Sequence, residues 1–401
     1  MTNRPPCSIK DGLEKHVDKA DDKTLRTILL ERIRAHGAIT FADFMAACLY
    51  EPGAGYYTSP GRKVGAEGDF YTSSNVHPVF GRLIAREIAQ MWRTMGKPAA
   101  FQIVEAGAGN GRLASDILNA IAELEPSLYA GLTYRLIEAE PSLAEMQLEM
   151  LSPHREKLAW STPDELASGE LAITGCLLSN ELIDALPVHL VEMTVDGLQE
   201  VFVATDGDNF SEQLAPPSSP AISEYFTRNG VSLPQGTRAE VRLAADSWLR
   251  GTARSLRKGF VLTIDYGYLA SELYGAMRQN GTLLCYFRHQ VAEDPFIRVG
   301  LQDITSHVDF TALMKAGEDN GLTTVWFGEQ YRFLIASGMM EEVLAMEARP
   351  VPESERLKDR LALKKLMLPD GGMGDTFKIL VQAKGVDRPE LLCQGNWTTK
   401  F

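Results

Sequence analysis

The chain has 401 residues, enough for two or three structural units at roughly 150 residues each. Apolar residues make up 45% of the sequence and charged residues 23%, which is typical of a globular protein and excludes a disordered or fibrous one. Forty basic and 53 acidic side chains give a net charge of −13, which repels phosphate backbones and argues against a nucleic-acid-binding protein. No segment approaches the ~18 continuous apolar residues of a membrane-spanning helix.

The N-terminal residues do not read as a targeting signal. Residues 1–22 lack the apolar stretch of a secretory signal and are too acidic for a mitochondrial presequence, so we expect a mobile tail and a cytoplasmic protein. The five cysteines lie far apart and form no CxxC pair. We therefore expect reduced thiols and no structural zinc site.

The next segment, residues 23–97, predicts a helical N-terminal cap. Apolar residues at positions 25, 28, 29 and 33 recur at the spacing of one helix face, and a second short helix is expected between Thr40 and Glu51. The stretch from Glu51 to Ser73 is then a long loop rich in glycine and aromatic residues. Because aromatic residues argue against disorder, a loop of this length is typical of a functional segment.

From about residue 98 the sequence alternates strands and helices. Short apolar runs predict strands at 101–105, 134–138, 175–179, 259–265, 321–327 and 377–383. Helices between successive strands imply parallel pairing with both faces of the sheet covered, which predicts one Rossmann-like α/β domain over residues 98–385. Residues 190–255 and 270–320 do not follow the alternation and are expected to be two insertions. Residues 386–401 form the expected C-terminal tail.

The most informative motif is a glycine-rich turn, IVEAGAGNG, after the first of these strands. Its glycines are Gly107, Gly109 and Gly111. They let a ligand approach the backbone closely, and amides at a helix start bind a carboxylate or phosphate. A dinucleotide site would need G-x-G-x-x-G/A, but Arg112 occupies its last position. Glu105 before the turn would repel a pyrophosphate but accept hydrogen bonds from an α-ammonium group, which predicts S-adenosylmethionine as the cofactor.

A second acidic residue, Glu138, ends the next predicted strand. A carboxylate at that position is placed to accept hydrogen bonds from both ribose hydroxyls of a nucleoside. The alternative for the whole pattern is a tight strand–helix turn beside a solvated Glu138. Glu105, Glu138 and the strand context together favour the cofactor site.

Seven segments of the chain stand in a recognisable order. They are EPGAGYY (51–57), GDFYTS (68–73), VEAGAGNGRLASDIL (104–118), SNELIDALPVH (179–189), DYGY (265–268), GTLLCYFRH (281–289) and DITSHVDF (303–310). Together they resemble the MidA-like family of class I S-adenosylmethionine-dependent methyltransferases, the family of the mitochondrial complex I assembly factor that dimethylates an arginine of a core subunit. The resemblance, which runs from about residue 24 to 385, implies a Rossmann-like methyltransferase that acts on protein arginine of a respiratory or related complex.

Mitochondrial members of the family commonly carry proline and arginine in the glycine turn, where this chain has Ala108 and Asn110. Because the glycines and both acids remain, we expect cofactor binding to be retained. The departure leaves undecided which molecule accepts the methyl group. An acidic surface suits a basic acceptor, so the expected partner is a protein substrate with a reactive arginine. Two alternatives remain: a non-catalytic module in which the cofactor only orders the fold while the insertions dock a partner, and a small-molecule methyltransferase.

Candidate catalytic residues follow the strand at 175–179, because ligands bind at this edge of open α/β sheets. Methyl transfer mainly needs an acceptor held in line in a dry site, and an arginine acceptor stays protonated, so carboxylates must hold its fork. We assign this role to Glu181, with Asp184 second and Asn180 as a polar orienter. A helical turn after Asn180 would place both acids on one face. The alternative is an N-capping Asn180 beside two solvated acids.

Two other groups are candidates for the same site. Asp265 and Tyr266 end another strand and are placed to line the acceptor pocket, unless Asp-Tyr-Gly only makes a turn. Asp69, Tyr71 and Thr72 of the N-terminal loop are expected to bind the cofactor by closing over its sulfonium, since a tyrosine ring attracts cations.

A polar cluster of His289, Asp303, Thr305 and His307 lies in the second predicted insertion. Histidine near carboxylates suits a general base or a metal site. The sequence has neither a His-x₃-His pair nor an acidic triad there, so we expect a hydrogen-bonded scaffold and no metal.

Overall fold

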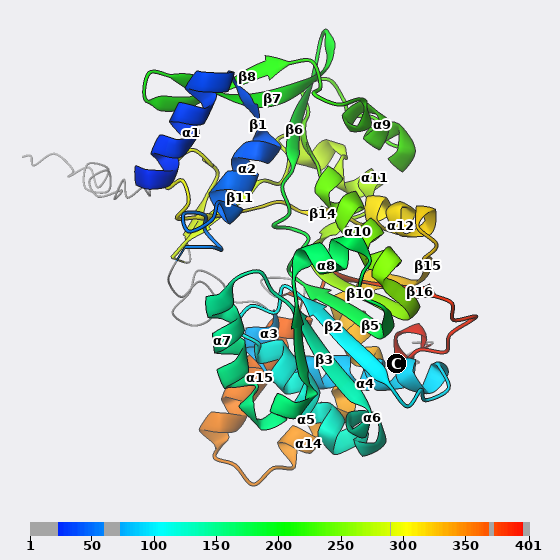
Figure 1. Ribbon diagram of the computed structural model, residues 1–401. Coiled ribbons are helices and arrows are strands. Elements are labelled where there is room, and N and C mark those ends of the chain that lie inside the picture. Colours follow the sequence, from blue (N-terminus) through cyan, green and yellow to red (C-terminus); the bar gives the residue numbers. More distant parts are fainter. Residues whose placement is uncertain (1–22, 60–72, 289, 369–372, 396–401) are drawn as a thin grey trace, which may run out of the picture.

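The computed structural model of the chain describes residues 23–59, 73–288, 290–368 and 373–395. These residues form two lobes, one built on a large sheet and the other on smaller antiparallel sheets (Figure 1). Within these ranges, no helix has the length and apolar character that spanning a bilayer requires.

The large sheet has the strand order β4-β3-β2-β5-β10-β16-β15. Its strands are β2 (Phe101–Ala106), β3 (Leu132–Ile137), β4 (Leu158–Ser161), β5 (Ile173–Asn180), β10 (Leu256–Tyr268), β15 (Thr323–Glu329) and β16 (Phe377–Lys384). Neighbouring strands pair in parallel except at β16, which is antiparallel to both β10 and β15. The predicted Rossmann-like α/β fold is confirmed. β4 was not predicted, because four residues are too few to show a strand pattern.

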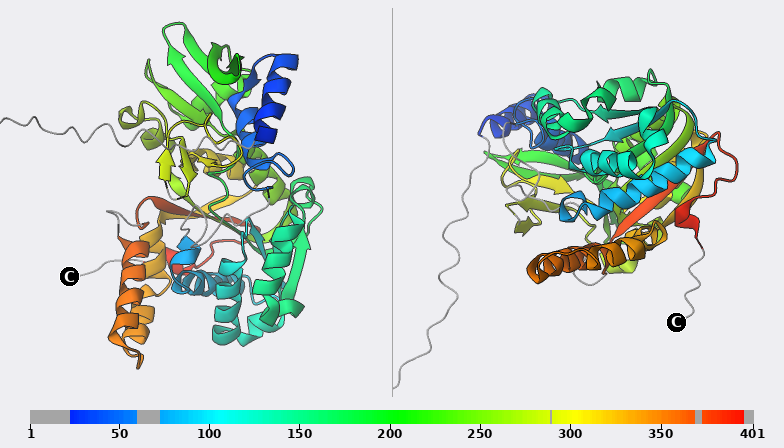
Figure 2. Two further views of the ribbon diagram at one scale, coloured as in Figure 1. Left: turned by 90° about the vertical axis from the view of Figure 1, so that its left-hand side faces the viewer. Right: turned by 90° about the horizontal axis from the view of Figure 1, so that it is seen from below.

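Helices cover both faces of the large sheet (Figure 2). One face carries α4 (Val79–Thr94), α5 (Arg112–Leu124), α6 (Pro126–Ala130) and α13 (Gln330–Ala336), and the other α8 (Pro163–Ser168), α10 (Leu243–Ser255) and α12 (Phe310–Asp319). In α5, Leu113, Ile117 and Ile121 recur along one side and are buried in a core shared with α4. The short helices α3 (Ser73–Val76), α7 (Pro141–Met150), η1 (Ser152–Lys157) and η3 (Leu392–Gln394) complete this lobe.

The second lobe combines the N-terminal helices with most of the two insertions. The predicted second insertion, 270–320, ends too late, because β14 (Val308–Asp309) pairs with β10 and α12 packs on the large sheet. The strands of this lobe are β1 (Ile39–Thr40), β6 (His189–Thr194), β7 (Gly197–Asp206), β8 (Asn209–Ala215) and β9 (Arg238–Val241) in one sheet, and β11 (Leu284–Phe287), β12 (Gln290–Ala292) and β13 (Asp303–Thr305) in another. Its helices are α1 (Lys23–His36), α2 (Phe41–Tyr50), α9 (Pro220–Asn229), α11 (Ala270–Leu273) and η2 (Ala276–Arg278). Leu29, Phe44, Val203 and Ile304, from four separate segments, are buried in one core. The cap and these parts of the insertions are therefore one structural unit.

The structure ends the first insertion earlier than residue 255. The predicted insertion 190–255 includes α10, but Leu249 and Ala253 of this helix are buried together with Val261 of β10. α10 thus packs on a face of the large sheet and is the last part of the crossover from β5 to its parallel neighbour β10. The departure from the strand–helix alternation covers the antiparallel strands β6 to β9 and α9.

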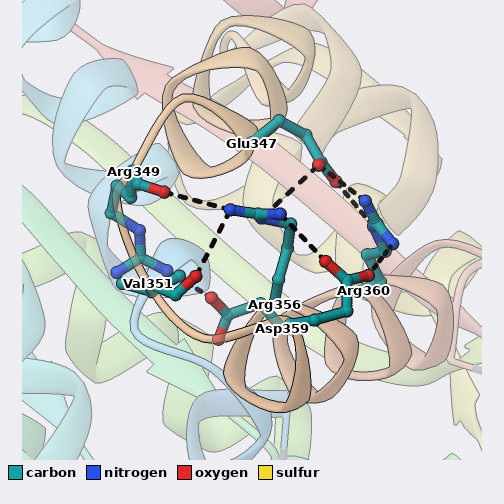
Figure 3. Close-up of polar contacts among 7 residues, drawn as sticks. Glu347, Arg349, Val351, Arg356, Asp359 and Arg360 are labelled. Atoms are coloured by element: carbon teal, nitrogen blue, oxygen red, sulfur yellow. Dashed lines mark hydrogen bonds and ion pairs between the residues drawn. The ribbon is translucent and has the colours of Figure 1, made fainter.

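A helical hairpin of α14 (Met339–Glu347) and α15 (Glu353–Met367) projects from the large-sheet lobe (Figure 1). Ion pairs join its two helices (Figure 3): Arg360 Nε lies 2.7 Å from Glu347 Oε1, and Arg349 pairs with Asp359. Arg356 also donates to the carbonyls of Arg349 and Val351, at 3.2 and 3.4 Å. These contacts hold the connection between the helices in one geometry.

Glycine is required where the strands of the large sheet approach most closely. Gly175 of β5 has φ +150° and pairs in register with Gln102 of β2 and Gly259 of β10. A Cβ at Gly175 would lie 1.9 Å from the Gln102 carbonyl oxygen. We predict that Gly175→Ala lowers the free energy of unfolding by at least ~3 kcal/mol, through strain and overpacking, as measured by urea denaturation.

Gly207→Ala is the matched control for this substitution. Gly207 has φ +62° in the turn between β7 and β8, and a Cβ there would meet nothing within 4 Å. Its substitution should cost only about 1 kcal/mol, from the left-handed conformation alone. Equal unfolding midpoints for the two variants would contradict the packing argument.

Candidate functional site

The glycine turn between β2 and α5 has the conformation that its sequence predicts. Gly107, Gly109 and Gly111 have φ of +76°, +52° and +81°, which other residues rarely adopt. A Cβ at Gly107 would lie 3.0 Å from Leu182 Cδ1, in the loop that follows β5. The glycines therefore serve two purposes: they make the turn, and they let the β5 loop approach it.

Glu105, one residue before the end of β2, is a buried carboxyl group. It is 2% exposed, and its Oε2 accepts a hydrogen bond of 2.7 Å from the Tyr134 hydroxyl. Burial raises the pKa of Glu105 to about 7, although the Tyr134 hydrogen bond opposes the shift. A positive ligand group beside it would favour the charged form.

Glu138 follows β3 and is connected to the glycine turn by Gln147 of α7. The Gln147 side-chain amide donates to Glu138 Oε2 and to the Gly109 carbonyl, both at 2.9 Å. Its oxygen accepts from the Trp160 indole at 3.0 Å, and Gln147 is fully buried. The other Glu138 oxygen accepts the backbone amides of residues 139 and 140. Burial raises the pKa of Glu138, and these hydrogen bonds oppose the shift.

The loop after β5 carries Glu181 in a strained conformation. Glu181 has φ +53°, which is unfavourable for a side-chain-bearing residue, and no helical turn follows Asn180. The condition under which Glu181 and Asp184 would share a helix face is therefore not met. Glu181 Oε1 accepts hydrogen bonds from the Ser73 amide at 3.0 Å and the Asn180 side chain at 3.2 Å. Burial, and then the nearby charge of Asp184, raise the pKa of Glu181 to about 8.

Asp184 is nearly buried, with 5% of its surface exposed, and its Oδ1 has no hydrogen-bond partner among the described residues. The Asn180 side-chain oxygen is likewise buried and unpartnered there. Burial raises the pKa of Asp184, while Tyr266 and the charge of Arg242 oppose the shift. Two acceptor atoms are thus left for donors outside the described chain.

Asp265 supports this loop and does not line an acceptor pocket, because both of its carboxyl oxygens accept hydrogen bonds from backbone amides. Its Oδ2 accepts the amides of Ile183 and Asp184 at 2.9 and 3.3 Å, and its Oδ1 accepts the amide of Tyr266 at 3.0 Å. Asp265 is completely buried, and burial raises its pKa well above the ordinary value. It holds the loop that presents Asp184.

Arg242, just before α10, fixes the same loop from the other side. Its guanidinium donates to the carbonyls of Asp184 and Leu186 at 2.8 and 3.1 Å. It also donates to the carbonyls of Ser306 and His307, in the second insertion, at 3.1 and 3.3 Å. Arg242 is 5% exposed. One buried charge therefore joins the β5 loop to the second lobe.

The polar cluster of the second insertion is largely a scaffold in the described residues. Asp303 accepts the Tyr57 hydroxyl at 2.8 Å, and Thr305 is buried in β13. Burial lowers the pKa of His307 to about 4, so its ring is neutral. No group of three metal-ligating side chains comes together in the described parts of the chain. His289 lies outside the described residues.

Three predicted cofactor residues, Asp69, Tyr71 and Thr72, also lie outside the described residues. Of the other predicted site residues, the structure places Glu105, Glu138 and the glycines around one turn. It places Asn180, Glu181 and Asp184 in the adjoining loop, where Leu182 contacts Gly107.

Sequence reasoning missed Gln147 and Arg242. A buried glutamine on an otherwise ordinary helix gives no local signal, and its partners lie 9 and 38 residues away. Arg242 stands beside two other charged residues, Arg238 and Glu240 of β9, so no local feature of the sequence marks it as the one whose charge is buried.

Comparisons with known proteins extend over most of the chain. A family model described as "Putative S-adenosyl-L-methionine-dependent methyltransferase" matches residues 83–328. The chain is 30% identical to the protein arginine methyltransferase NDUFAF7, mitochondrial, of Danio rerio, over 74% of this chain and 73% of that protein. It is 28% identical to the Drosophila melanogaster homolog, over 89% of this chain and 84% of that protein.

A solved structure is similar over nearly its whole length. It is a crystal structure of a Burkholderia thailandensis protein bound to S-adenosyl-homocysteine, with a TM-score of 0.83 and 30% identity over 92% of this chain and 94% of that one. Because the similarity covers both lobes, it concerns the whole fold and not only the glycine turn.

A substitution of Gln147 tests whether its side-chain amide positions Glu138, the carboxylate proposed to bind the cofactor ribose. We predict that Gln147→Met weakens S-adenosylmethionine binding by about tenfold, because Glu138 loses a buried hydrogen bond and the turn loses its anchor. Isothermal titration with the cofactor measures this.

Gln90→Met is the control, since the side-chain hydrogen bonds of Gln90 within the described ranges go to the Glu390 carbonyl and to Arg93, away from the glycine turn. Unchanged cofactor affinity in Gln147→Met, with Gln90→Met equally unaffected, would show that Gln147 does not position Glu138.

Proposed function

The chain belongs to this family of S-adenosyl-L-methionine-dependent methyltransferases, and on that basis we propose that it methylates an arginine side chain of a protein. Its relatives carry the name protein arginine methyltransferase, which supports the proposed acceptor. Their names also place those relatives in mitochondria. A cytoplasmic location for this chain stays a prediction.

The cofactor is S-adenosylmethionine, and the residues around the glycine turn fit it. Glu105 offers a buried carboxyl to an α-ammonium group, and Glu138 offers carboxylate oxygens to ribose hydroxyls. The glycine turn, whose Gly107, Gly109 and Gly111 have positive φ, connects the strand that carries Glu105 to α5 and is anchored to Glu138 through Gln147. When bound, the cofactor supplies an electrophilic methyl group on its sulfonium.

The observation that carries the proposed acceptor is the acidic loop after β5. Asp184 lies close enough to Glu181 for its negative charge to add to the effect of burial in raising the pKa of Glu181, and Asp184 Oδ1 has no partner among the described residues. Such a site is stabilised by a ligand that has several N–H donors, a positive charge and no acceptor. A guanidinium group meets all three conditions.

The chain's own residues would perform three tasks in the transfer. Glu181 Oε1 is held by Ser73 and Asn180, so the same carboxyl group can orient the acceptor through Oε2. The Asn180 oxygen is available as a second acceptor of hydrogen bonds. The acceptor nitrogen loses one proton when its bond to carbon forms. Once the bound cation lowers the raised pKa of Glu181 and its carboxyl group is ionised, that carboxylate is placed to take the proton.

Glu181→Gln tests the proposed function directly. We predict nearly unchanged affinity for S-adenosylmethionine and a fall of at least ~100-fold in methyl transfer, because the amide neither carries the charge nor takes the proton. The measurement incubates wild-type and variant protein with radiolabelled S-adenosylmethionine and cell lysate, followed by mass spectrometry for methylarginine.

Glu329→Gln serves as the control, since Glu329 also ends a strand of the large sheet but, among the described residues, forms an ion pair only with Arg332. Label in small molecules and none in protein would favour a small-molecule methyltransferase. Equal transfer by wild type and Glu181→Gln would refute the role of Glu181.

A further inference from the structure

We propose that the acceptor arginine binds at the junction of the two lobes, between Asp184 and the stacked rings of Tyr50 and Tyr57. This inference rests on the proposed function and adds the part of the acceptor site that comes from the N-terminal cap. Tyr50 ends α2, Tyr57 follows it in the same segment, and Asp184 belongs to the loop after β5.

The two tyrosines form a rigid aromatic wall. Their ring centroids lie 5.5 Å apart with an interplanar angle of 23°. The Tyr50 hydroxyl donates to the Ala185 carbonyl at 3.0 Å, and the Tyr57 hydroxyl donates to Asp303 Oδ2 at 2.8 Å. Both rings are thus fastened at their far ends, while Tyr50 remains 37% exposed. An exposed ring that is held in place offers its face to a ligand.

Asp184 supplies the charge beside this wall. The hydrogen bond from Tyr50 ends at the carbonyl of Ala185, the residue after Asp184, so the loop after β5 contacts the wall directly. Burial is the main cause that raises the pKa of Tyr50 and Tyr57, and the negative charges of Asp303 and Asp184 add to it. Burial and then the charge of Asp184 likewise raise the pKa of Glu181, the residue proposed to orient the acceptor. Asp184 is therefore close both to Glu181 and to the aromatic wall.

The backbone of Asp184 is fixed on both sides, and its carboxyl group is hydrogen-bonded to the Tyr266 side chain. Its amide is bonded to Asp265, and its carbonyl accepts from Arg242 at 2.8 Å and from the Ser306 amide at 3.3 Å. The carboxyl oxygen Oδ1 nevertheless stays buried without a partner in the described chain. Leaving a buried acceptor unpaired is costly, which a donor on the acceptor substrate would correct.

A planar cation fits this combination better than a point charge. A guanidinium group stacks on an aromatic face and donates in its own plane to a carboxylate, whereas an ammonium group is more strongly hydrated and has no plane to stack. The site thus selects the side chain of arginine over that of lysine. The second insertion contributes to this acceptor site, because its Asp303 accepts the hydrogen bond that fixes the Tyr57 ring.

The test uses the full chain saturated with S-adenosyl-homocysteine and a small probe, N-acetyl-L-arginine amide, in an NMR titration. N-acetyl-L-citrulline amide is the neutral probe of the same shape, and N-acetyl-L-lysine amide is the other cation. We expect the arginine probe to bind at least ~10-fold more tightly than either.

Three variants locate the probe. Asp184→Asn should weaken binding of the arginine probe by about tenfold and Tyr50→Leu by about fivefold, while Tyr50→Phe, which keeps the ring, should change it less than ~3-fold. Tyr331→Leu, on α13, is the control and should bind like wild type. Unchanged affinity for S-adenosyl-homocysteine and an unchanged melting temperature in each variant show that the fold is intact.

The outcomes separate this inference from the proposed function. If wild type forms methylarginine on protein but Asp184→Asn and Tyr50→Leu bind the arginine probe like wild type, the acceptor site lies elsewhere and this inference is refuted. Equal binding of the arginine and citrulline probes refutes it as well. If wild type labels protein without forming methylarginine, the proposed function fails, whatever the probes show.

Discussion

The site depends on two buried charges whose hydrogen bonds go to backbone groups of one loop. Asp265 accepts amides of the loop after β5, and Arg242 donates to its carbonyls and to those of the second insertion. Removing either charge would leave several buried backbone groups unpaired. The loop is therefore held in a single conformation, in which Glu181 keeps a positive φ. The two lobes meet at this loop, so the same hydrogen bonds also fix the position of one lobe relative to the other.

Much of the large-sheet lobe follows from local patterns in the sequence. Each long strand of the sheet is an apolar run, and the glycine turn is fixed by three residues that need positive φ. Glu105 and Glu138 are found by their positions at strand ends, which parallel pairing brings to one edge. These features depend on neighbours in sequence, and the order of the motifs then identifies the family.

The rest depends on contacts between distant segments and gives no local pattern. The N-terminal cap shares a core with strands more than 150 residues later, such as Val203. Arg242 acts on residues 56 to 65 positions away, and Tyr57 is fixed by Asp303 across 246 positions. The conformation after Asn180 has the same origin: the Glu181 amide donates to the Ile264 carbonyl of β10, a contact that no local pattern describes.

The central claim is that the acidic loop after β5 is a site for a cation. At pH 7 a carboxyl group with a pKa of about 8, such as Glu181, is mostly protonated without a ligand, and a bound cation lowers that pKa. Isothermal titration of the full chain with N-acetyl-L-arginine amide, in buffers of different ionisation enthalpy, measures the protons exchanged. We expect about one proton to be released per bound probe, and the affinity of the protein for the probe to rise as the pH approaches 8. Binding without proton release, or with proton uptake, would contradict this claim.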